Sequence, residues 1–194
     1  MNKLTISRIA GICGILLTVV SLTTILVSSI MFQLDWYQNV LSQIGAGDDL
    51  TAKIFNYGLI IAGILGIVFA YGLFKVVDYA ISKIGCILFL VASISVIGIG
   101  IFDMRYGGLH DLIALLFFGI SPISIGVIGA GFIVKRRIKI GIATIIPAVV
   151  SGLFAIVTYV SLIAINEFIP VVSIAIWVFV ISIKLIQSTI SNKS

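Results

Sequence analysis

Charged residues are scarce in this chain. Only 10% of its 194 residues are Asp, Glu, Lys or Arg, whereas 61% are hydrophobic. A soluble domain carries charge at about a quarter of its positions, because its surface must face water. So few charges exclude a water-soluble globule. We expect an all-α integral membrane protein that forms one domain over residues 1–194.

Histidine and cysteine are also rare. The chain has one histidine, His110, and two cysteines, Cys13 and Cys86, which both lie in apolar runs. A disulfide framework needs paired cysteines in an oxidising aqueous compartment, and a metal site needs ligands that lie together. We therefore expect free, buried thiols, no metal site and no cofactor.

Six long apolar runs account for most of the chain. They cover residues 9–32, 54–74, 84–102, 112–134, 138–163 and 169–183. A helix needs about 20 apolar residues to cross a bilayer core of about 30 Å. The runs do not alternate in polarity with a period of two, as strands of a membrane barrel would. They predict six transmembrane helices. The first run is longer than the apolar core of a cleaved signal, so we expect it to be retained.

Basic and acidic residues separate along the chain. Ten of the twelve Lys and Arg residues lie before the first run, beside the second and fourth connections, or after the sixth run. Six of the seven acidic residues lie in the other connections, and Asp78 is the exception. Short basic loops stay in the cytoplasm. We therefore predict a multi-pass protein of the cell membrane with both termini cytoplasmic and three short outer loops.

The densest basic segment is KRRIK, residues 135–139. Such a segment also occurs in proteins that bind nucleic acid, but beside a membrane helix it is typical of an anchor that contacts anionic lipid headgroups. We expect this lipid contact from Lys135, Arg136, Arg137 and Lys139, and we expect no nucleic-acid partner.

A stripe of small residues runs along the second span. Gly58, Ala62, Gly66 and Ala70 recur every four residues, which places them on one face of a helix. Membrane helices associate through close packing at such residues. We expect the stripe to pack against helices of the same chain, with a second copy or another membrane protein as the alternative partner.

The first outer loop, residues 33–53, is the longest connection. Trp36 and Tyr37 are typical interface anchors. Residues 36–44 are expected to form a short helix that lies on the membrane. Its predicted lipid-facing residues are Trp36, Val40, Leu41 and Ile44. A loop that folds back as a lid is the alternative. Asn56, just inside the second span, needs hydrogen-bond partners that the region of Ser42 can supply.

The connection around His110 has two interpretations. In the structural one, glycines make the turn and Asp111 caps the fourth helix, while Asp103 ends the third. In the catalytic one, His110 is a general base that Asp103 or Asp111 orients. Ser42 is then the best candidate nucleophile, although no spacing places it beside His110.

Three segments resemble a known family. They are LSQIGAG (41–47), AKIFNYGLIIAGIL (52–65) and GIFDMRYGGLHDLIALLFFGISPISIGVIG (100–129). They are similar to the six-span membrane proteins of archaea and bacteria catalogued as domain of unknown function 998. The matching positions are Ser42, Ile44, Gly45, Phe55, Asn56, Gly58, His110, Phe117 and Phe118. The resemblance implies six membrane helices and no particular activity.

Three functions remain open after this reading. The first is a non-enzymatic protein, either an accessory subunit of a membrane complex or a binder of a lipid or small amphiphile at Ser42, Asn56 and His110. The second is a lipid hydrolase that acts at the outer face through His110. The third is a small uncoupled transporter hinged at Pro122 and Pro147. Because no acidic residue falls inside the six runs, proton coupling is disfavoured.

The predicted orientation can be tested by cysteine labelling in a Cys13→Ala, Cys86→Ala background. We expect Arg137→Cys to react with a membrane-impermeant maleimide only after the cells are broken, because basic loops are retained inside. Asp48→Cys should react in intact cells. The reverse pattern of labelling would overturn the orientation.

Overall fold

The computed structural model describes residues 2–191, except for the side chains of residue 159 and residues 188–191. Lys193, one of the expected inner basic residues, lies outside the described residues. Within this part of the chain there are six long helices and no strand. The helices are α1 (Lys3–Phe32), α2 (Leu50–Val76), α3 (Ala80–Ile101), α4 (Gly108–Val134), α5 (Ile138–Val160) and α6 (Ala164–Ser191). Each contains a segment long and apolar enough to cross a membrane. The prediction of an all-α, six-span protein is confirmed.

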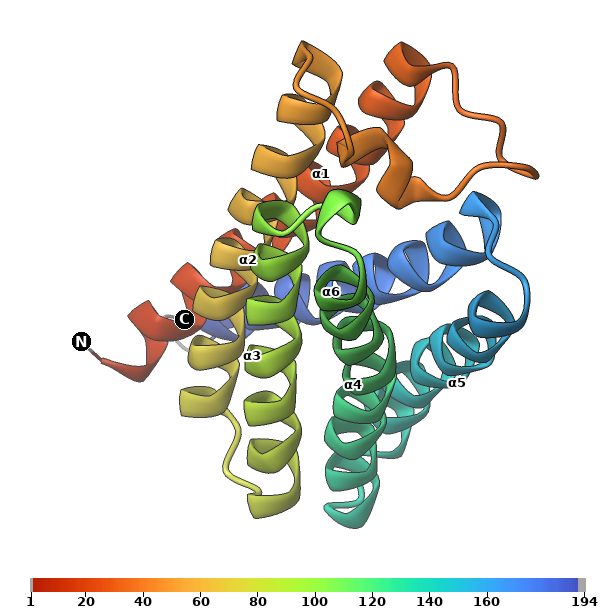
Figure 1. Ribbon diagram of the computed structural model, residues 1–194. Coiled ribbons are helices and arrows are strands. Elements are labelled where there is room, and N and C mark those ends of the chain that lie inside the picture. The colour runs from red at the N-terminus through yellow and green to blue at the C-terminus, as the bar shows by residue number, and fades with distance from the viewer. Residues whose placement is uncertain (1, 192–194) are drawn as a thin grey trace.

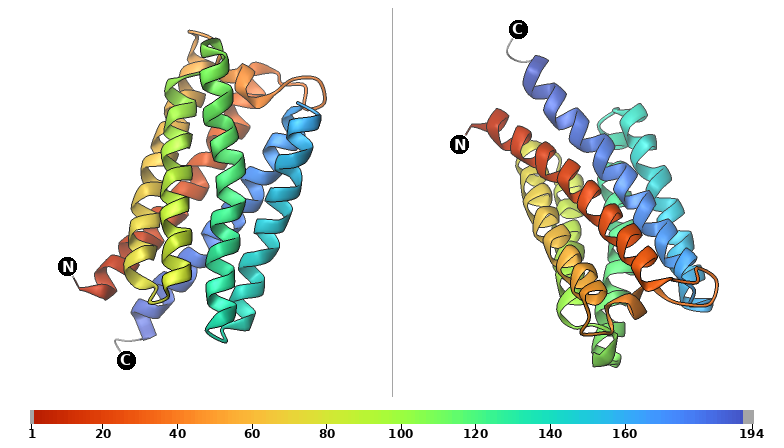
Figure 2. Two further views of the ribbon diagram at one scale, coloured as in Figure 1. Left: turned by 60° about the horizontal axis from the view of Figure 1, so that its bottom comes forward. Right: turned by 90° about the horizontal axis from the view of Figure 1, so that it is seen from above.

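The helices form a closed ring. Each packs against its neighbours in the sequence, and α6 returns to pack against α1 (Figures 1 and 2). The start of α1 and the end of α6 lie at one end of the ring, which we call the terminal end, together with the α2–α3 and α4–α5 turns. The opposite end, which we call the distal end, carries the loop from α1 to α2 and two short 3-10 helices, η1 (Leu41–Gly45) and η2 (Met104–Tyr106).

Several helices begin earlier than their apolar runs predict. The Asp49 carboxylate accepts a hydrogen bond from the Ala52 N–H at 2.8 Å and caps α2, so α2 starts four residues before the apolar run at 54. Helix α4 starts at Gly108 rather than at 112, which places His110 and Asp111 inside its first turn. In α4 the N-cap residue is Gly107 and no side chain accepts from the first backbone N–H groups, so the expected cap by Asp111 is wrong.

The largest difference concerns α6. The run at 169–183 predicts a short span, but α6 covers Ala164–Ser191. Glu167 therefore lies inside a helix rather than in a loop, and Pro170 lies in the helix interior rather than at its start. Proline cannot donate to the carbonyl four residues before it. The Thr158 hydroxyl of α5 donates to that carbonyl, Asn166 O, at 2.9 Å and replaces the missing donor.

Aromatic side chains fill the middle of the ring. Phe69 of α2, Phe89 of α3 and Trp177 of α6 are buried and pack together with ring centroids 5.3–5.9 Å apart. A second apolar cluster closes the distal end, where η1 contributes Leu41 and Ile44 to a core shared with α1, α2 and α6. The ring is therefore packed at its centre and covered at its distal end.

Glycines bring neighbouring helices into close contact. A Cβ atom placed on Gly11, Gly63 or Gly85 would lie 2.7–2.8 Å from the backbone oxygen of Ser182, Ser93 or Ser124, respectively, on the adjacent helix. These contacts join α1 to α6, α2 to α3 and α3 to α4. Only glycine allows the backbones to come so close.

The small-residue stripe of α2 is buried in the same way. Gly58, Ala62, Gly66 and Ala70 are all buried within the chain. A Cβ atom on Gly58 would overlap Thr24 of α1, and one on Gly66 would lie 2.6 Å from the Ser93 hydroxyl of α3. The stripe thus packs between two helices of its own chain.

A matched pair of glycine substitutions tests this packing. Gly63→Ala should lower the free energy of unfolding by about 1–3 kcal/mol, because its methyl group meets rigid backbone of α3. Gly119→Ala, where no atom lies within 4 Å of the new methyl group, should not destabilise the protein. Unfolding in mixed micelles at increasing dodecyl sulfate measures both. Equal stability of the two variants would contradict the close approach of α2 and α3.

Candidate functional site

Two groups of polar side chains stand out, one at each end of the ring. The distal group contains the residues that the sequence singled out. The terminal group contains basic side chains from three separate segments. The two arrangements suit different chemistry.

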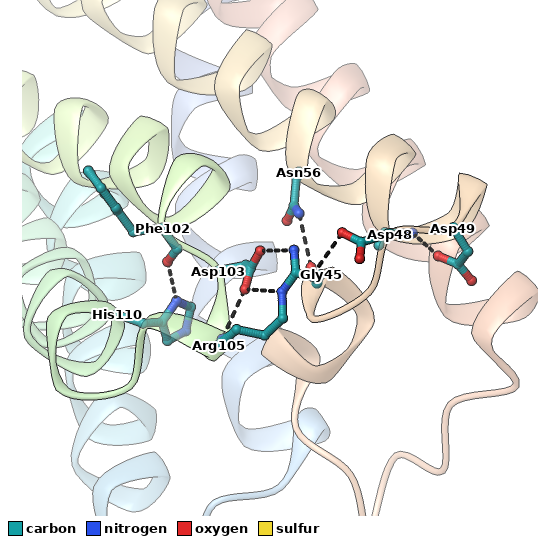
Figure 3. Close-up of polar contacts among 9 residues, drawn as sticks. Gly45, Asp48, Asp49, Asn56, Phe102, Asp103, Arg105 and His110 are labelled. Atoms are coloured by element: carbon teal, nitrogen blue, oxygen red, sulfur yellow. Dashed lines mark hydrogen bonds and ion pairs between the residues drawn. The ribbon is translucent and has the colours of Figure 1, made fainter.

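His110 is held by the turn that precedes α4. Gly107 has a φ of 55°, a backbone conformation that favours glycine, and it directs the chain into the first turn of α4. The His110 ring is buried, and its Nδ1 lies 2.8 Å from the Phe102 carbonyl oxygen (Figure 3). Because a carbonyl only accepts, Nδ1 is the protonated nitrogen. Nε2 is also buried and has no hydrogen-bond partner among the described residues.

An ion triad links the two distal turns. The Arg105 side chain donates to both carboxylate oxygens of Asp103, from Nε to Oδ1 at 3.0 Å and from Nη2 to Oδ2 at 2.8 Å. Its Nη1 donates to Asp48 Oδ1 at 2.8 Å (Figure 3). Asp103 is buried, whereas Asp48 is exposed. Arg105 therefore ties the loop before α2 to the turn between α3 and α4.

The triad also fixes the charge of its members. Hydrogen bonds from the Arg105 side chain lower the pKa of Asp103, although burial alone would raise it. The two carboxylates, Asp103 first, raise the pKa of Arg105. Asp103 additionally caps η2 by accepting from the Arg105 backbone N–H at 2.9 Å. Both oxygens of the Asp103 carboxylate therefore accept hydrogen bonds from Arg105.

These contacts bear on the catalytic interpretation. Asp103 is occupied by Arg105, and Asp111 is exposed and makes no hydrogen bond to His110. Ser42, in η1, is half-buried and also makes no hydrogen bond to His110. The expectation that Asp103 or Asp111 orients His110 is wrong, because the Phe102 carbonyl does so instead.

Asn56 finds its partner in the segment that the sequence indicates. Its Nδ2 donates to the Gly45 carbonyl at 3.0 Å, and Gly45 belongs to the same short helix as Ser42. A Cβ atom on Gly45 would overlap Asn56 Oδ1, so only glycine fits there. The amide of Asn56 therefore holds η1 against α2.

The first loop folds inward rather than along the membrane. Leu41 and Ile44 are buried, and Trp36 packs against Phe168 of α6 with a centroid distance of 5.1 Å. The predicted lipid-facing helix over residues 36–44 is wrong, since only Leu41–Gly45 is helical and its apolar side chains face the protein. The lid alternative describes the observed structure.

The start of α6 explains why the loop folds back. The free N–H groups of Ala164 and Ile165 donate to the carbonyls of Asn39 at 2.7 Å and Trp36 at 3.1 Å. The buried Glu167 carboxylate accepts from the Leu41 N–H at 2.7 Å. Sequence reasoning misses Glu167 because the apolar run appears to begin after it, and the only signal is an acidic residue beside a span.

A cavity of about 1240 Å³ lies at the terminal end. It is bounded by the start of α1, the α2–α3 turn, the α4–α5 turn and the last turns of α6. Its basic side chains are Lys3, Arg136, Arg137, Lys139 and Lys184. Its one acidic side chain, Asp78, pairs with Lys3 at 2.8 Å, and this hydrogen bond lowers the pKa of Asp78. The cavity therefore carries an excess of positive charge.

Apolar side chains form the larger part of the cavity wall, and Ser7, Tyr79 and Gln187 add polar groups to it. Buried side chains line its wall: Leu73, Val77, Phe132, Ile181 and Leu185. Three of the four expected headgroup ligands of the KRRIK segment lie at the cavity. The fourth, Lys135, lies over the Tyr79 ring, 5.4 Å from its centroid. Sequence reasoning finds the KRRIK cations but not that Lys3 and Lys184 join them.

Arg136 holds an unusual backbone conformation at this cavity. Its φ of 58° is left-handed, and the Arg137 N–H donates to the Phe132 carbonyl at 2.9 Å to end α4. Glycine normally occupies this position of the helix end. An arginine here costs backbone energy, and residues kept in such conformations cluster at functional sites.

Comparison with known proteins identifies a family but no characterised relative. A family model described as a protein of unknown function, DUF998, matches residues 8–184. No curated protein and no solved structure matches the chain significantly. The match includes parts of all six helices, and of the five basic side chains at the cavity it leaves out only Lys3.

The ion triad predicts a specific loss of stability in acid. Asp103→Asn should lower the Tm at neutral pH by about 2–4 °C, because Arg105 loses its buried partner. Since the folded pKa of Asp103 is lowered, its stabilisation is present near neutrality and is lost as the pH falls through that pKa. Wild type and Asp103→Asn should therefore begin to converge as the pH falls below about 4, the ordinary pKa of an aspartate, and should meet only below the lowered pKa of Asp103. Asp48→Asn changes the exposed partner of Arg105 and should lower the Tm less than Asp103→Asn does. A difference in Tm between wild type and Asp103→Asn that persists in acid would contradict this account.

Proposed function

The chain belongs to the DUF998 family, and we propose that it is a non-enzymatic membrane protein that binds an anionic amphiphile in its terminal cavity. The observation that carries this proposal is the cavity itself, with five basic side chains at a largely apolar wall. Like charges gathered in a partly enclosed space attract a counter-ion, because the low-dielectric walls focus their field.

The lining suits an amphiphile better than a simple ion. Ligand sites combine mostly apolar walls with a few polar groups that orient the ligand. Here the wall is made by buried residues such as Phe132 and Ile181, and the cations stand at the rim. An acyl chain gains free energy on the wall, and a phosphate or carboxylate pairs with the rim.

The charge pattern of the loops supports the same assignment. We place the terminal end in the cytoplasm of a cell-membrane protein, since its connections carry most of the basic residues. The cytoplasmic leaflet is rich in anionic lipids, which basic segments near the membrane attract. The cavity would then open where its ligand is most abundant.

The other functions have less support from the described contacts. Hydrolysis through His110 lacks a carboxylate partner for the histidine and a serine bonded to it. Transport hinged at Pro122 and Pro147 needs a passage, whereas Phe69, Phe89 and Trp177 fill the ring centre. Binding needs neither feature.

The variant Arg136→Gly separates binding from folding. Glycine relieves the left-handed backbone, so the free energy of unfolding should stay the same or rise by about 0.5–1 kcal/mol. Loss of one cation should weaken the binding of anionic lipid by about fivefold. Native mass spectrometry of protein in mixed phosphatidylglycerol and phosphatidylcholine micelles measures the bound lipid.

Gln33→Gly is the matched control, because Gln33 has the same conformation, with a φ of 56°, at the end of α1. It should change stability in the same direction and leave lipid binding unchanged. Unchanged lipid binding by Arg136→Gly would contradict the proposal. A stoichiometric protein in place of lipid would identify an accessory subunit instead.

A further inference from the structure

We propose that the ligand is a bilayer phospholipid that enters the terminal cavity sideways, between α5 and α6. This inference rests on the proposed function and names the source of the anion. A phosphate group can arrive on a soluble molecule from the aqueous phase or on a lipid from the leaflet. The arrangement of α5 and α6 favours the lipid.

Helices α5 and α6 are joined in their distal halves. The Thr158 hydroxyl donates to Asn166 O at 2.9 Å near the distal end. Further along, the Ser173 hydroxyl donates to Pro147 O at 3.1 Å. From there toward the terminal end the two helices diverge, as the views in Figures 1 and 2 show. The seam between α5 and α6 is therefore closed on its distal side and widens on its terminal side.

The other seam of α6 stays closed. A Cβ atom on Gly11 of α1 would lie 2.8 Å from the Ser182 carbonyl oxygen of α6. Nearer the terminal end, the Ser7 hydroxyl donates to the Leu185 carbonyl at 2.9 Å. In its terminal half α6 thus follows α1 and leaves α5, so the space between α5 and α6 is the side on which the ring opens.

The cavity occupies this opening. Its lining includes Ile138 and Ile140 from the first turn of α5, and Ile181, Lys184 and Gln187 from the last turns of α6. Both walls belong to segments apolar enough to lie in a membrane. On the proposed route an acyl chain passes between these two apolar helices from the hydrocarbon of the leaflet, so it does not cross water.

The positions of the charges then give the orientation of the lipid. Arg136 and Arg137 belong to the α4–α5 turn and Lys139 to the first turn of α5, and Lys184 of α6 lines the same cavity. Ile181, one turn before Lys184 on α6, and Leu185 next to Lys184 add buried apolar side chains to the same wall. A phosphate at the turn and an acyl chain along α6 would satisfy both parts of the cavity. A soluble phosphate would leave the apolar wall uncovered.

A reversible bridge across the opening tests this route. In a Cys13→Ala, Cys86→Ala background, Ile138→Cys and Gln187→Cys place thiols on α5 and α6 at the two sides of the opening. A bismaleimide with a reducible linker joins them. The control is the same protein capped with N-ethylmaleimide, which modifies both cysteines without closing the gap. Each form is reconstituted in phosphatidylcholine vesicles with and without phosphatidylglycerol.

We expect the capped protein to retain phosphatidylglycerol. The bridged protein should retain none, so that its bound lipid is the same whether or not the vesicles contain phosphatidylglycerol. Reduction of the linker should restore retention, which excludes loss of the fold as the cause. Glycerol phosphate, the headgroup without chains, should not displace the lipid from the capped protein, because it gains nothing from the apolar wall.

The remaining outcomes separate the two proposals. Equal retention by the bridged and capped proteins would overturn lateral entry while leaving lipid binding intact. Displacement by glycerol phosphate, with binding of glycerol phosphate to both forms, would identify a soluble anion as the ligand. If the capped protein retains neither phosphatidylglycerol nor glycerol phosphate, the proposed function itself is wrong.

Discussion

Close approach of helix backbones at glycine is the contact on which this structure depends. Lipid is as apolar as the side chains, so no hydrophobic force drives the helices together, and packing must do so. A Cβ atom on Gly11, Gly63 or Gly85 would lie 2.7–2.8 Å from a backbone oxygen of the neighbouring helix. These contacts hold α1 to α6, α2 to α3 and α3 to α4, which sets the ring. Where α5 and α6 diverge, the ring opens into the terminal cavity.

The two ends of the ring differ in how their charges are paired. At the distal end polar groups are paired with each other: Arg105 with two aspartates, Asn56 with Gly45, and Glu167 with the loop backbone. These contacts close a lid over an apolar cluster. Among the described residues of the terminal cavity, five basic side chains face one acidic side chain, Asp78, which pairs with Lys3. Paired charges stabilise a fold, whereas an excess of one sign attracts a ligand.

The sequence predicted much of the fold but a smaller part of the sites. Six apolar runs identified six helices, yet the run at 169 concealed a start at Ala164, because Glu167 and Asn166 interrupt the apolar pattern. Periodicity cannot show that Leu41 and Ile44 face the protein, since an interfacial helix and a lid expose the same apolar face to different surroundings. The pairing of Asn56 with the segment around Ser42 could be predicted from the sequence, because few polar groups lie near Asn56 along the chain.

By itself the sequence determined that this is a membrane protein with six helices, and it separated basic from acidic connections. Both are local properties, since the transfer of each segment into lipid depends on its own residues. Only the tertiary structure decided that Lys3, Arg136 and Lys184 share one cavity, and that Arg105 rather than His110 holds Asp103. Such meetings join residues far apart in the chain. These long-range contacts depend on the distance and angle at which the helices cross. Packing of small residues sets both, and it does so only when all six helices are assembled.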